Sequence, residues 1–242
     1  MLLMGLSEEQ LLAQFAATRK ASTQLAMAPT ERKQLVLHAL ASLLTEQSSQ
    51  ILAANQLDVD QMAFDNPMRD RLLLTTQRIQ DLADSVRDVA LLPDPSGQVL
   101  LHKTLANGLD LQKIAVPLGV VGVIYESRPN VTIDVAALCV RSGNAAVLRG
   151  GSDAWHTNHI LVSLIHQALQ KAEFPTDLVR LMPTDREHVQ TLLTAVRFID
   201  VIIPRGSDAL IQRVRRESLV PTIETGAGVC HTYVAESAEL NM

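Results

Sequence analysis

The chain has 242 residues, 47% of them hydrophobic, and can therefore bury a sizeable core as one large α/β domain or as one domain with a smaller appendage. Its formal net charge is -5, from 21 Lys and Arg against 26 Asp and Glu, without a basic tail or patch. This balance argues against general binding to nucleic acid or to anionic membrane surfaces as the main task. No apolar run approaches about 18 residues, so the sequence predicts no membrane-spanning helix.

The two cysteines, Cys139 and Cys230, have no metal-ligand spacing and are too few for a disulfide framework. The histidines show no ligand pattern either, so we predict no metal site. The apolar N-terminal residues run at once into Glu8 and Glu9 and lack the basic start of a secretion signal. We therefore predict a reduced, cytoplasmic location.

Helical patterns fill residues 1–98. Residues Ser7 to Gln10 have the form of a capping box, in which the serine and glutamine side chains satisfy each other's free backbone donors, and predict the start of a first helix. Pro29 interrupts the pattern before a second apolar stripe over residues 35–52. A third stripe, from Thr75 to Leu91, ends where prolines follow. We expect these helices to pack together as an N-terminal helical segment.

A β-hairpin is predicted over residues 99–117. Two runs that alternate in polarity, Val99 to Leu105 and Leu109 to Val116, flank Asn107-Gly108. This pair of residues tolerates the positive φ values of a type I′ turn. The hairpin separates the helical segment from the rest of the chain.

From residue 118 the pattern changes to short apolar strands that alternate with helices, which is typical of a parallel sheet. Ligands of such sheets lie beyond the carboxyl ends of the strands. We therefore expect residues 118–242 to form a Rossmann-like domain with its ligand site at that edge. The predicted strands are Val120 to Tyr125, Ala145 to Leu148, Leu178 to Met182, Ile199 to Ile203 and Val220 to Ile223, and the predicted helices are Val131 to Arg141, Ala154 to Ala172, Arg186 to Val196 and Ala209 to Glu217.

Two of the strand-to-helix turns carry nearly the same residues. Arg149-Gly150-Gly151-Ser152 follows the second strand and Arg205-Gly206-Ser207 follows the fourth, each just before a helix. Glycines let a ligand approach the backbone, free amides at a helix N-terminus bind anions, and a guanidinium can hold a phosphate with two hydrogen bonds. These residues predict a nucleotide site. Alternatively, Ser152 and Ser207 only cap their helices and both arginines are solvated.

The first strand leads into Tyr125 to Asn130, which lacks the Gly-x-Gly-x-x-Gly fingerprint of common dinucleotide sites. A dinucleotide would therefore bind by another scheme. Glu126, Arg128 and Asn130 cluster at the end of this strand and could orient a substrate or stabilise an oxyanion. The alternative is an ordinary helix that begins at Pro129.

Glu224 and Cys230 are two further candidates for chemistry. Glu224 follows the last predicted strand, so its carboxylate is expected to point into the same crevice, where it could orient a nicotinamide ribose or act as a base; the alternative is a solvated turn residue. Cys230 stands beside His231, but adjacent residues of an extended segment point to opposite faces and cannot pair as nucleophile and base. Cys139 lies in an apolar run and is expected to be a buried small hydrophobe.

Several blocks of the sequence resemble the gamma-glutamyl phosphate reductases, a family within the aldehyde dehydrogenase superfamily. The blocks run from the second helical region to the C-terminus and cover most of the chain. They are Asp70-Arg71-Leu72, Leu92 to Pro95, Pro117 to Asn130, Ser142 to Ser152, Pro204-Arg205-Gly206 and Pro221 to His231.

The resemblance implies an aldehyde dehydrogenase-like α/β fold, in which N-terminal helices and an assembly hairpin lead into a parallel sheet of about five strands. It also implies NADPH-dependent reduction of L-glutamate 5-phosphate to the 5-semialdehyde, with release of phosphate, in proline biosynthesis. In this family a cysteine thiolate displaces the phosphate to give a thioester, which then accepts hydride. A homo-oligomer and functional coupling to glutamate 5-kinase are further implied.

The resemblance also assigns roles to the cofactor candidates. Arg149 to Ser152 lie where the superfamily holds the adenosine ribose and its 2′-phosphate. Gly206 and Ser207, just after Arg205, lie where a helix N-terminus meets the pyrophosphate.

On the reacting side, Asn130 resembles the oxyanion donor of the superfamily, and Glu126 and Arg128 of the same block are expected to contact substrate. Glu224 resembles the active-site glutamate. A reductase of an acyl phosphate does not need that glutamate to activate water, which leaves it a role in orientation.

The catalytic cysteine of the family lies in a segment later than the Cys230-His231 block, beyond the end of this sequence. The 242 residues are therefore expected to carry the cofactor-binding half without the catalytic domain, and to be inactive alone. Ser237 to Met242 reads as a helix start without room for the helix, which favours a truncated chain. The alternative is a genuine short product, a non-catalytic nucleotide-binding or assembly protein.

Overall fold

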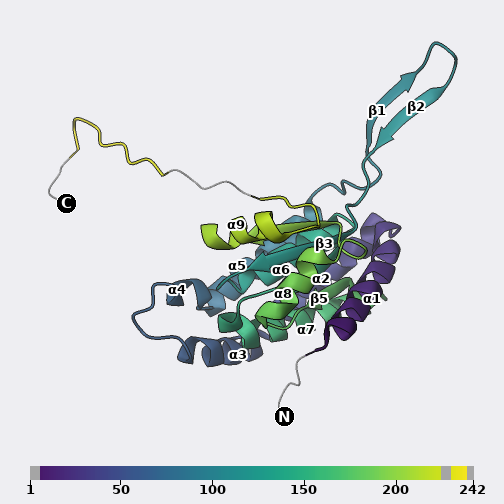
Figure 1. Cartoon of the computed structure of the whole chain (residues 1–242). Helices are drawn as coiled ribbons and strands as arrows, with labels where there is room; N and C mark the ends of the chain where they lie inside the picture. Colours follow the sequence, from purple (N-terminus) through teal and green to yellow (C-terminus); the bar gives the residue numbers. More distant parts are fainter. Residues whose placement is uncertain (1–5, 225–229, 239–242) are drawn as a thin grey trace.

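The computed structural model describes residues 6–224 and 230–238. A parallel sheet lies between two layers of helices, and a β-hairpin extends away from this body (Figure 1). The α/β class expected from the sequence is confirmed. Within these ranges, none of the helices has the length and apolar character of a membrane span.

The helices before the hairpin are α1 (Glu8–Ala26), α2 (Thr30–Glu46), α3 (Ser48–Asp60), α4 (Arg69–Leu72) and α5 (Thr76–Leu91). The predicted capping box begins α1. The Gln10 N–H donates to Ser7 Oγ over 3.2 Å, and the Ser7 N–H donates to Gln10 Oε1 over 2.9 Å. Both side chains thus satisfy backbone donors that the first turn leaves free.

The predicted second helix is wrong in one respect, because the structure divides it at Gln47. This residue has φ -105° and ψ 20°, outside the helical range, so α2 ends at Glu46 and α3 begins at Ser48. Its carbonyl accepts a hydrogen bond from the Ile51 N–H, which starts the new helix. The change of direction places Ile51 in the core, while Leu35 of the predicted stripe is 50% exposed.

The hairpin consists of β1 (Val99–Thr104) and β2 (Asp110–Ile114), as predicted, but its turn is of another type. The Gly108 N–H donates to Leu105 O over 2.9 Å, and Gly108 has φ 83°. Asn107 is not at positive φ, as a type I′ turn would require. The connection is therefore a three-residue loop closed by a left-handed glycine.

The parallel sheet contains β3 (Val120–Tyr125), β4 (Ala145–Arg149), β5 (Val179–Leu181) and β6 (Val201–Arg205), in the spatial order β5-β4-β3-β6. The helices that alternate with these strands are α6 (Asn130–Arg141), α7 (Trp155–Lys171), α8 (Arg186–Thr194) and α9 (Asp208–Glu217). All residues of β3 are buried. Strands covered on both faces read as continuous apolar runs, which is why their positions were predictable.

The predicted fifth strand, Val220 to Ile223, is present only as an isolated parallel bridge between Ile202 and Thr222. The Ile202 N–H donates to Pro221 O over 2.8 Å, and the Ile223 N–H donates to Ile202 O over 2.9 Å. Pro221 has no N–H of its own, which limits the ladder that this segment can form beside β6.

The order of the strands creates a crevice between β3 and β6. The chain passes from β3 to β4 and β5 and then returns to β6 on the other side of β3. Helices α6 and α7 cover one face of the sheet, with α2 packed against both of them, whereas α1 and α8 pack on the other face, and α9 contacts α8 (Figure 1). The turns after β3 and β6 therefore lead to opposite faces, and ligands bind at such a switch point in open α/β sheets.

A carboxylate of α3 caps the N-terminus of α7, 98 positions later in the chain. Asp58 is buried and accepts hydrogen bonds from the His156 N–H over 3.0 Å, the Thr157 N–H over 2.7 Å and the Thr157 hydroxyl over 2.6 Å. These donors would otherwise be unsatisfied at the first turn of α7. The N-terminal helices thus fix the turn that follows β4.

Candidate functional site

A groove of about 680 Å³ lies at the carboxyl ends of β3, β4 and β6, in the crevice of the switch point. We call it the switch-point groove. The turns after these strands and the first turns of α9 form its walls, so the two turns singled out in the sequence meet in one site. Residues that line it include Glu126, Ser127, Arg149, Ser152, Ser207 and Arg213.

The N-terminus of α9 binds a carboxylate of the chain itself. Ser207 is the N-cap residue, and its N–H donates to Glu126 Oε2 over 2.8 Å while its hydroxyl donates to Glu126 Oε1 over 3.3 Å. Gly206 makes room for this contact, because a Cβ there would lie 2.5 Å from Glu126 Oε2. Free amides and the helix dipole favour negative charge at this position.

Arginines reach the groove from two sides. Arg149, at the end of β4, donates from Nη2 to Thr184 O over 2.7 Å, which ties it to the loop after β5. Arg213 projects from α9 and donates from Nε to Glu217 Oε2 over 2.9 Å. Arg205 differs from both, because it is exposed at the end of β6 and is not among the residues that line the groove.

The predicted cofactor residues Gly150 and Ser152 have different surroundings. Gly150 is buried behind the groove, where a Cβ would collide with the side-chain amide of Asn158. Ser152 lines the groove and makes no capping hydrogen bond. The capping alternative therefore applies to Ser207, whose Oγ accepts from the Leu210 N–H over 3.4 Å, and not to Ser152.

Ser127 and Asp153 line the groove and were not predicted as site residues. Ser127 has φ 38°, which is uncommon for a residue other than glycine, and it is 9% exposed. Its hydroxyl donates to Asp153 Oδ2, which joins the turn after β3 to the turn after β4. Such backbone conformations persist where the surroundings hold them, often at functional sites. No pattern in the sequence indicates a positive φ at a serine.

A buried hydrogen-bond chain supports the groove from below. The Tyr125 hydroxyl lies 2.6 Å from Thr132 Oγ1, and the Thr132 hydroxyl donates to Asn158 Oδ1 over 2.7 Å. Burial raises the pKa of Tyr125, so its phenol stays protonated. These hydrogen bonds link the end of β3 to α6 and α7, the helices that follow the turns after β3 and β4.

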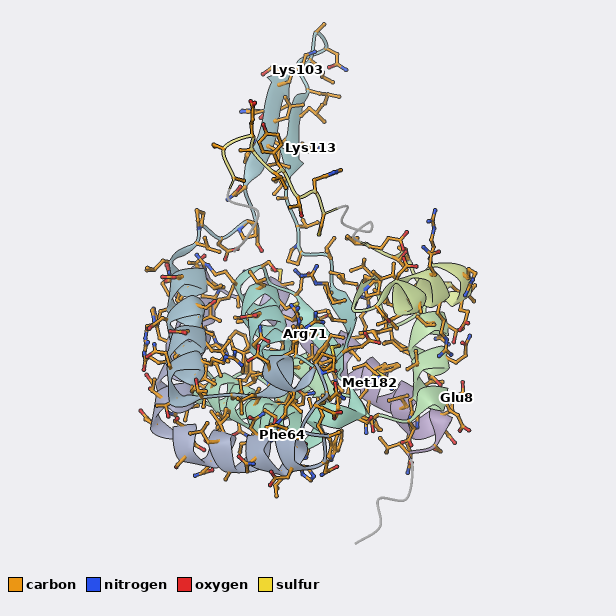
Figure 2. All side chains as sticks on the ribbon, turned by 90° about the vertical axis from the view of Figure 1, so that its left-hand side faces the viewer. Glu8, Phe64, Arg71, Lys103, Lys113 and Met182 are labelled. Atoms are coloured by element: carbon orange, nitrogen blue, oxygen red, sulfur yellow. The ribbon has the colours of Figure 1, made fainter. Side chains whose placement is uncertain are left out.

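A second pocket, of about 410 Å³, lies on the other side of the β3–α6 turn, against α4 and α5. We call it the α5–α6 pocket. Arg128 and Asn130 line this pocket, whereas Glu126 lines the groove, so the structure divides the predicted substrate cluster. Asn130 Nδ2 donates to Asp134 Oδ2 over 3.2 Å. Arg71 also lines the pocket, near the middle of the face shown in Figure 2.

Glu224 is described, but it is not among the residues that line the groove. Its Oε1 lies 3.4 Å from Arg215 Nε, and its Oε2 is buried without a hydrogen-bond partner in the described part of the chain. Its role in the crevice stays a prediction. Thr225 to Gly228, quoted with it, lie outside the described residues.

The two cysteines have opposite surroundings. Cys139 is buried, and burial raises the pKa of its thiol to about 12, which agrees with a small hydrophobe and not with a nucleophile. Cys230 is exposed. The structure shows no group of three metal-ligating side chains in residues 6–224 and 230–238. The predicted helix start at Ser237 to Met242 falls partly outside the described residues.

The strand order and the switch-point groove define a doubly wound α/β protein with its ligand site at the carboxyl ends of the strands. A profile described as aldehyde dehydrogenase family matches residues 4–241. The chain belongs to this family, and the resemblance read from the sequence blocks is confirmed.

Curated relatives in this family are named gamma-glutamyl phosphate reductase. The chain is 49% identical over 222 residues to the protein of Bacteroides fragilis and 49% identical over 235 residues to that of Chlorobium phaeobacteroides. The alignments cover 92% and 97% of this chain but only 54% and 56% of the relatives. The chain thus spans about half the length of the curated relatives it matches.

Solved structures agree with this assignment. The crystal structure of gamma-glutamyl phosphate reductase from Thermotoga maritima superimposes with a TM-score of 0.88 at 38% identity, and it matches 95% of this chain and 56% of that one. The enzyme from Saccharomyces cerevisiae gives a TM-score of 0.80 at 29% identity, over 90% of this chain and 56% of its own.

Proposed function

We propose that this chain carries the NADPH-binding half of a cytoplasmic reductase that converts L-glutamate 5-phosphate to L-glutamate 5-semialdehyde and phosphate in proline biosynthesis. The observation that carries the proposal is the switch-point groove, where the N-terminus of α9 already holds an anion and Arg149 and Arg213 line the walls. The names of the relatives support the substrate and the reaction. The cofactor, when bound, supplies hydride.

The residues of the groove fit a dinucleotide phosphate. The Ser207 N–H would donate to the pyrophosphate after Glu126 moves away, and Gly206 lets the backbone approach. Arg149 and Ser152, on the β4 side, would hold the adenosine ribose and its 2′-phosphate. The volume of about 680 Å³ lies within the range of roughly 300–1,000 Å³ that is usual for ligand sites.

Two residues outside the groove are proposed for the reacting end. Asn130 would stabilise an oxyanion, which requires its amide to turn from Asp134, the acceptor it has in this structure. Glu224 would orient the nicotinamide or the acyl group. The buried Oε2 of Glu224 has no hydrogen-bond partner among residues 6–224 and 230–238, which supports this role, since a buried acceptor is costly to leave without a donor.

We further propose which parts of the chain bind the cofactor and which part mediates assembly. Residues 1–98 and 118–242 together build the cofactor domain, and residues 99–117 form an arm for assembly into a homo-oligomer. All residues of β1 and β2 are exposed, and a two-stranded hairpin is marginally stable in water unless something packs on it. Functional coupling to glutamate 5-kinase would supply the unstable acyl phosphate.

The experiment that tests the cofactor site uses the 242-residue chain and NADPH fluorescence. Ser207 has φ -63°, which proline adopts without strain, so Ser207→Pro removes the N–H donor while it preserves the backbone. Ser207→Ala removes only the hydroxyl. We expect Ser207→Pro to weaken NADPH binding about tenfold more than Ser207→Ala, as for a lost charge-assisted hydrogen bond. If the unaltered chain shows no saturable NADPH binding, the proposal is wrong.

A further inference from the structure

The α5–α6 pocket carries a second inference, which deepens the proposed function by placing the amino-acid end of its substrate. The pocket lies between α4, α5 and the first turns of α6 and shares no lining residue with the switch-point groove, from which the turn between β3 and α6 separates it. Charged side chains of both signs line it. They are Arg71, Arg78, Arg128, Asp70, Asp81 and Asp134. Asp81 accepts a hydrogen bond from Gln77 Nε2 over 2.8 Å.

Of the three guanidinium groups that line this pocket, one is held by other residues of the chain and two have no partner among the described residues. Arg78 is held by the chain, since its Nη1 donates to Asp70 O and to Leu73 O, each over 2.6 Å, and its Nη2 donates to Asp70 Oδ1 over 2.9 Å. Arg71 and Arg128 make no side-chain hydrogen bond or ion pair with the described residues. The pocket therefore presents two guanidinium groups that can donate hydrogen bonds to a ligand's carboxylate without breaking an existing contact.

The pocket also presents a carboxylate with a weak partner. Asp134 is half-buried on α6, and its hydrogen bond comes from the neutral amide of Asn130 over 3.2 Å. Burial raises the pKa of Asp134, more than the amide lowers it. A half-buried carboxylate without a cation beside it gains most from a ligand that brings one, such as an ammonium group.

The charges of both signs decide the class of ligand. A phosphate or a dicarboxylate would satisfy Arg71 and Arg128 but would face the carboxylate of Asp134, and a diamine would face the guanidinium groups. A zwitterion satisfies both sets. We infer that the α5–α6 pocket binds the α-amino and α-carboxylate groups of an amino acid, with the α-carboxylate at Arg71 and Arg128 and the α-ammonium at Asp134.

The position of the pocket beside the groove determines where the side chain of a bound amino acid would extend. Ser127 lines the groove and Arg128 lines the pocket, so the two cavities share the turn between β3 and α6. The side chain of an amino acid held in the pocket extends over this turn toward the groove. In the proposed reductase, this places the acyl phosphate next to the cofactor and leaves the recognition of the amino acid to α5 and α6.

The test compares three ligands of equal length with the 242-residue chain, by saturation-transfer NMR and titration calorimetry. L-Glutamate has both α groups, glutarate lacks the ammonium, and 4-aminobutyrate lacks the α-carboxylate. We expect L-glutamate to bind about tenfold more tightly than either analogue, because each analogue leaves one charge of the pocket unpaired. Equal binding of all three, equally effective competition by inorganic phosphate, or no saturable binding of L-glutamate would overturn the inference.

Variants separate the two charges. Asp134→Asn should lower the affinity for L-glutamate about tenfold but should not lower the affinity for glutarate, which no longer faces a carboxylate. Arg128→Ala should lower the affinity for L-glutamate and leave the affinity for 4-aminobutyrate unaffected. Arg87→Ala is the matched control, because Arg87 lies on α5 outside the pocket and pairs with Asp84. Loss of affinity for all ligands alike in Asp134→Asn would contradict the assignment of the ammonium site. Thermal unfolding of each variant shows that it is folded.

The inference and the proposed function can fail separately. NADPH binding is measured on the same samples. Arg213→Ala, in the groove, should lower the affinity for NADPH without changing the affinity for L-glutamate. If NADPH binds and L-glutamate does not, the pocket assignment falls and the cofactor site stands. If L-glutamate binds with the expected charge dependence and NADPH does not, the pocket stands and the cofactor proposal falls.

Discussion

Glu126 and Ser207 are 81 positions apart in the chain, yet the Ser207 N–H donates to Glu126 Oε2 over 2.8 Å at the switch point. The carboxylate thus occupies the anion site that the N-terminus of α9 offers. A phosphate of a dinucleotide and this carboxylate cannot use the same N–H. Glu126 therefore competes with the ligand that its own groove is proposed to bind.

Replacing Glu126 with Gln should raise the affinity for NADPH. The amide keeps the size of the side chain but removes the negative charge that a phosphate would have to displace. We expect the Kd from NADPH fluorescence to fall by about threefold to tenfold. Glu31→Gln, exposed in the first turn of α2, is the control for loss of one negative charge. A weaker affinity in Glu126→Gln than in this control would show that the carboxylate assists binding.

Replacing Arg149 with Ala should lower the affinity for NADPH far more than the affinity for NADH. A lost charge-assisted contact with the 2′-phosphate is worth about 1.5–3 kcal/mol, and NADH has no such phosphate. Arg205→Ala is the matched control, because Arg205 ends β6 as Arg149 ends β4 but is exposed and outside the groove. Competition titrations with the two cofactors measure the difference. Equal losses for NADPH and NADH would remove Arg149 from the 2′-phosphate site.

Asp58→Ala should destabilise the whole chain. It removes three hydrogen bonds at the N-terminus of α7 and leaves the N–H groups of His156 and Thr157 without an acceptor. We expect a loss of about 2–4 kcal/mol in the free energy of unfolding, measured with urea. Asp60→Ala, exposed at the end of the same helix, should cost less than about 0.5 kcal/mol. Similar losses in both variants would show that the cap contributes little.

Protonation of the Asp94 carboxylate should lower the free energy of unfolding in acid. Burial alone would raise its pKa, but hydrogen bonds from the Ser96 N–H, the Lys33 ammonium and the Thr30 hydroxyl outweigh burial and lower the pKa to about 2. A pKa below the unfolded value means that the ionised carboxylate stabilises the fold above about pH 4, and that this stabilisation is lost as the pH falls toward 2.

The shift corresponds to about 2 kcal/mol, which Asp94→Asn should remove from the acid dependence of the free energy of unfolding. At pH 7 the variant should be less stable than the unaltered chain, because the ammonium of Lys33, which is 1% exposed, loses its counter-charge. Urea titrations from pH 7 to 2 measure both effects. Asp88→Asn, exposed on α5, is the control. An unchanged acid slope in Asp94→Asn would contradict the assignment.

The hairpin should mediate self-association. Leu101 pairs with Lys113 and Leu111 with Lys103, so one face of the hairpin alternates leucine and lysine, and Figure 2 shows both lysines on the projecting arm. Replacing Leu101 and Leu111 together by Lys concentrates four positive charges there and should shift the chain toward monomer, as measured by light scattering. Leu91→Lys, 73% exposed on α5, should not. An unaltered chain that is monomeric throughout would contradict the proposed assembly arm.

The sheet and its ligand edge were predictable because parallel strands covered on both faces are continuous apolar runs. The helix at Ser7 was predictable because a capping box is a local signal. The break at Gln47 was not, since it depends on how Ile51 reaches a core formed by distant segments. The prediction of the fifth strand was wrong for a different reason, because Pro221 has no N–H to donate and the segment pairs with β6 only at an isolated bridge.

The site was predictable only in part. Glycine, serine and arginine after strands indicated the walls of the switch-point groove, and Arg149, Ser152 and Ser207 all line it. The sequence could not show that Glu126 and Arg128, two positions apart, enter different cavities, because that depends on the positive φ of Ser127 between them. Side-chain direction at a strained turn is set by tertiary contacts and has no local pattern.

The cap that Asp58 places on α7 has a consequence for how the protein folds. The contact closes a loop of 98 residues, and the first turn of α7 is complete only when the N-terminal helices have docked. A polypeptide that starts at residue 118 would contain every strand of the parallel sheet and still lack this acceptor. The division at the hairpin is thus a boundary in the sequence that this contact crosses, and non-local contacts of this kind slow the approach to the native state. During synthesis, Asp58 of α3 can make this contact only after His156 of α7, which follows 98 residues later, has been synthesised.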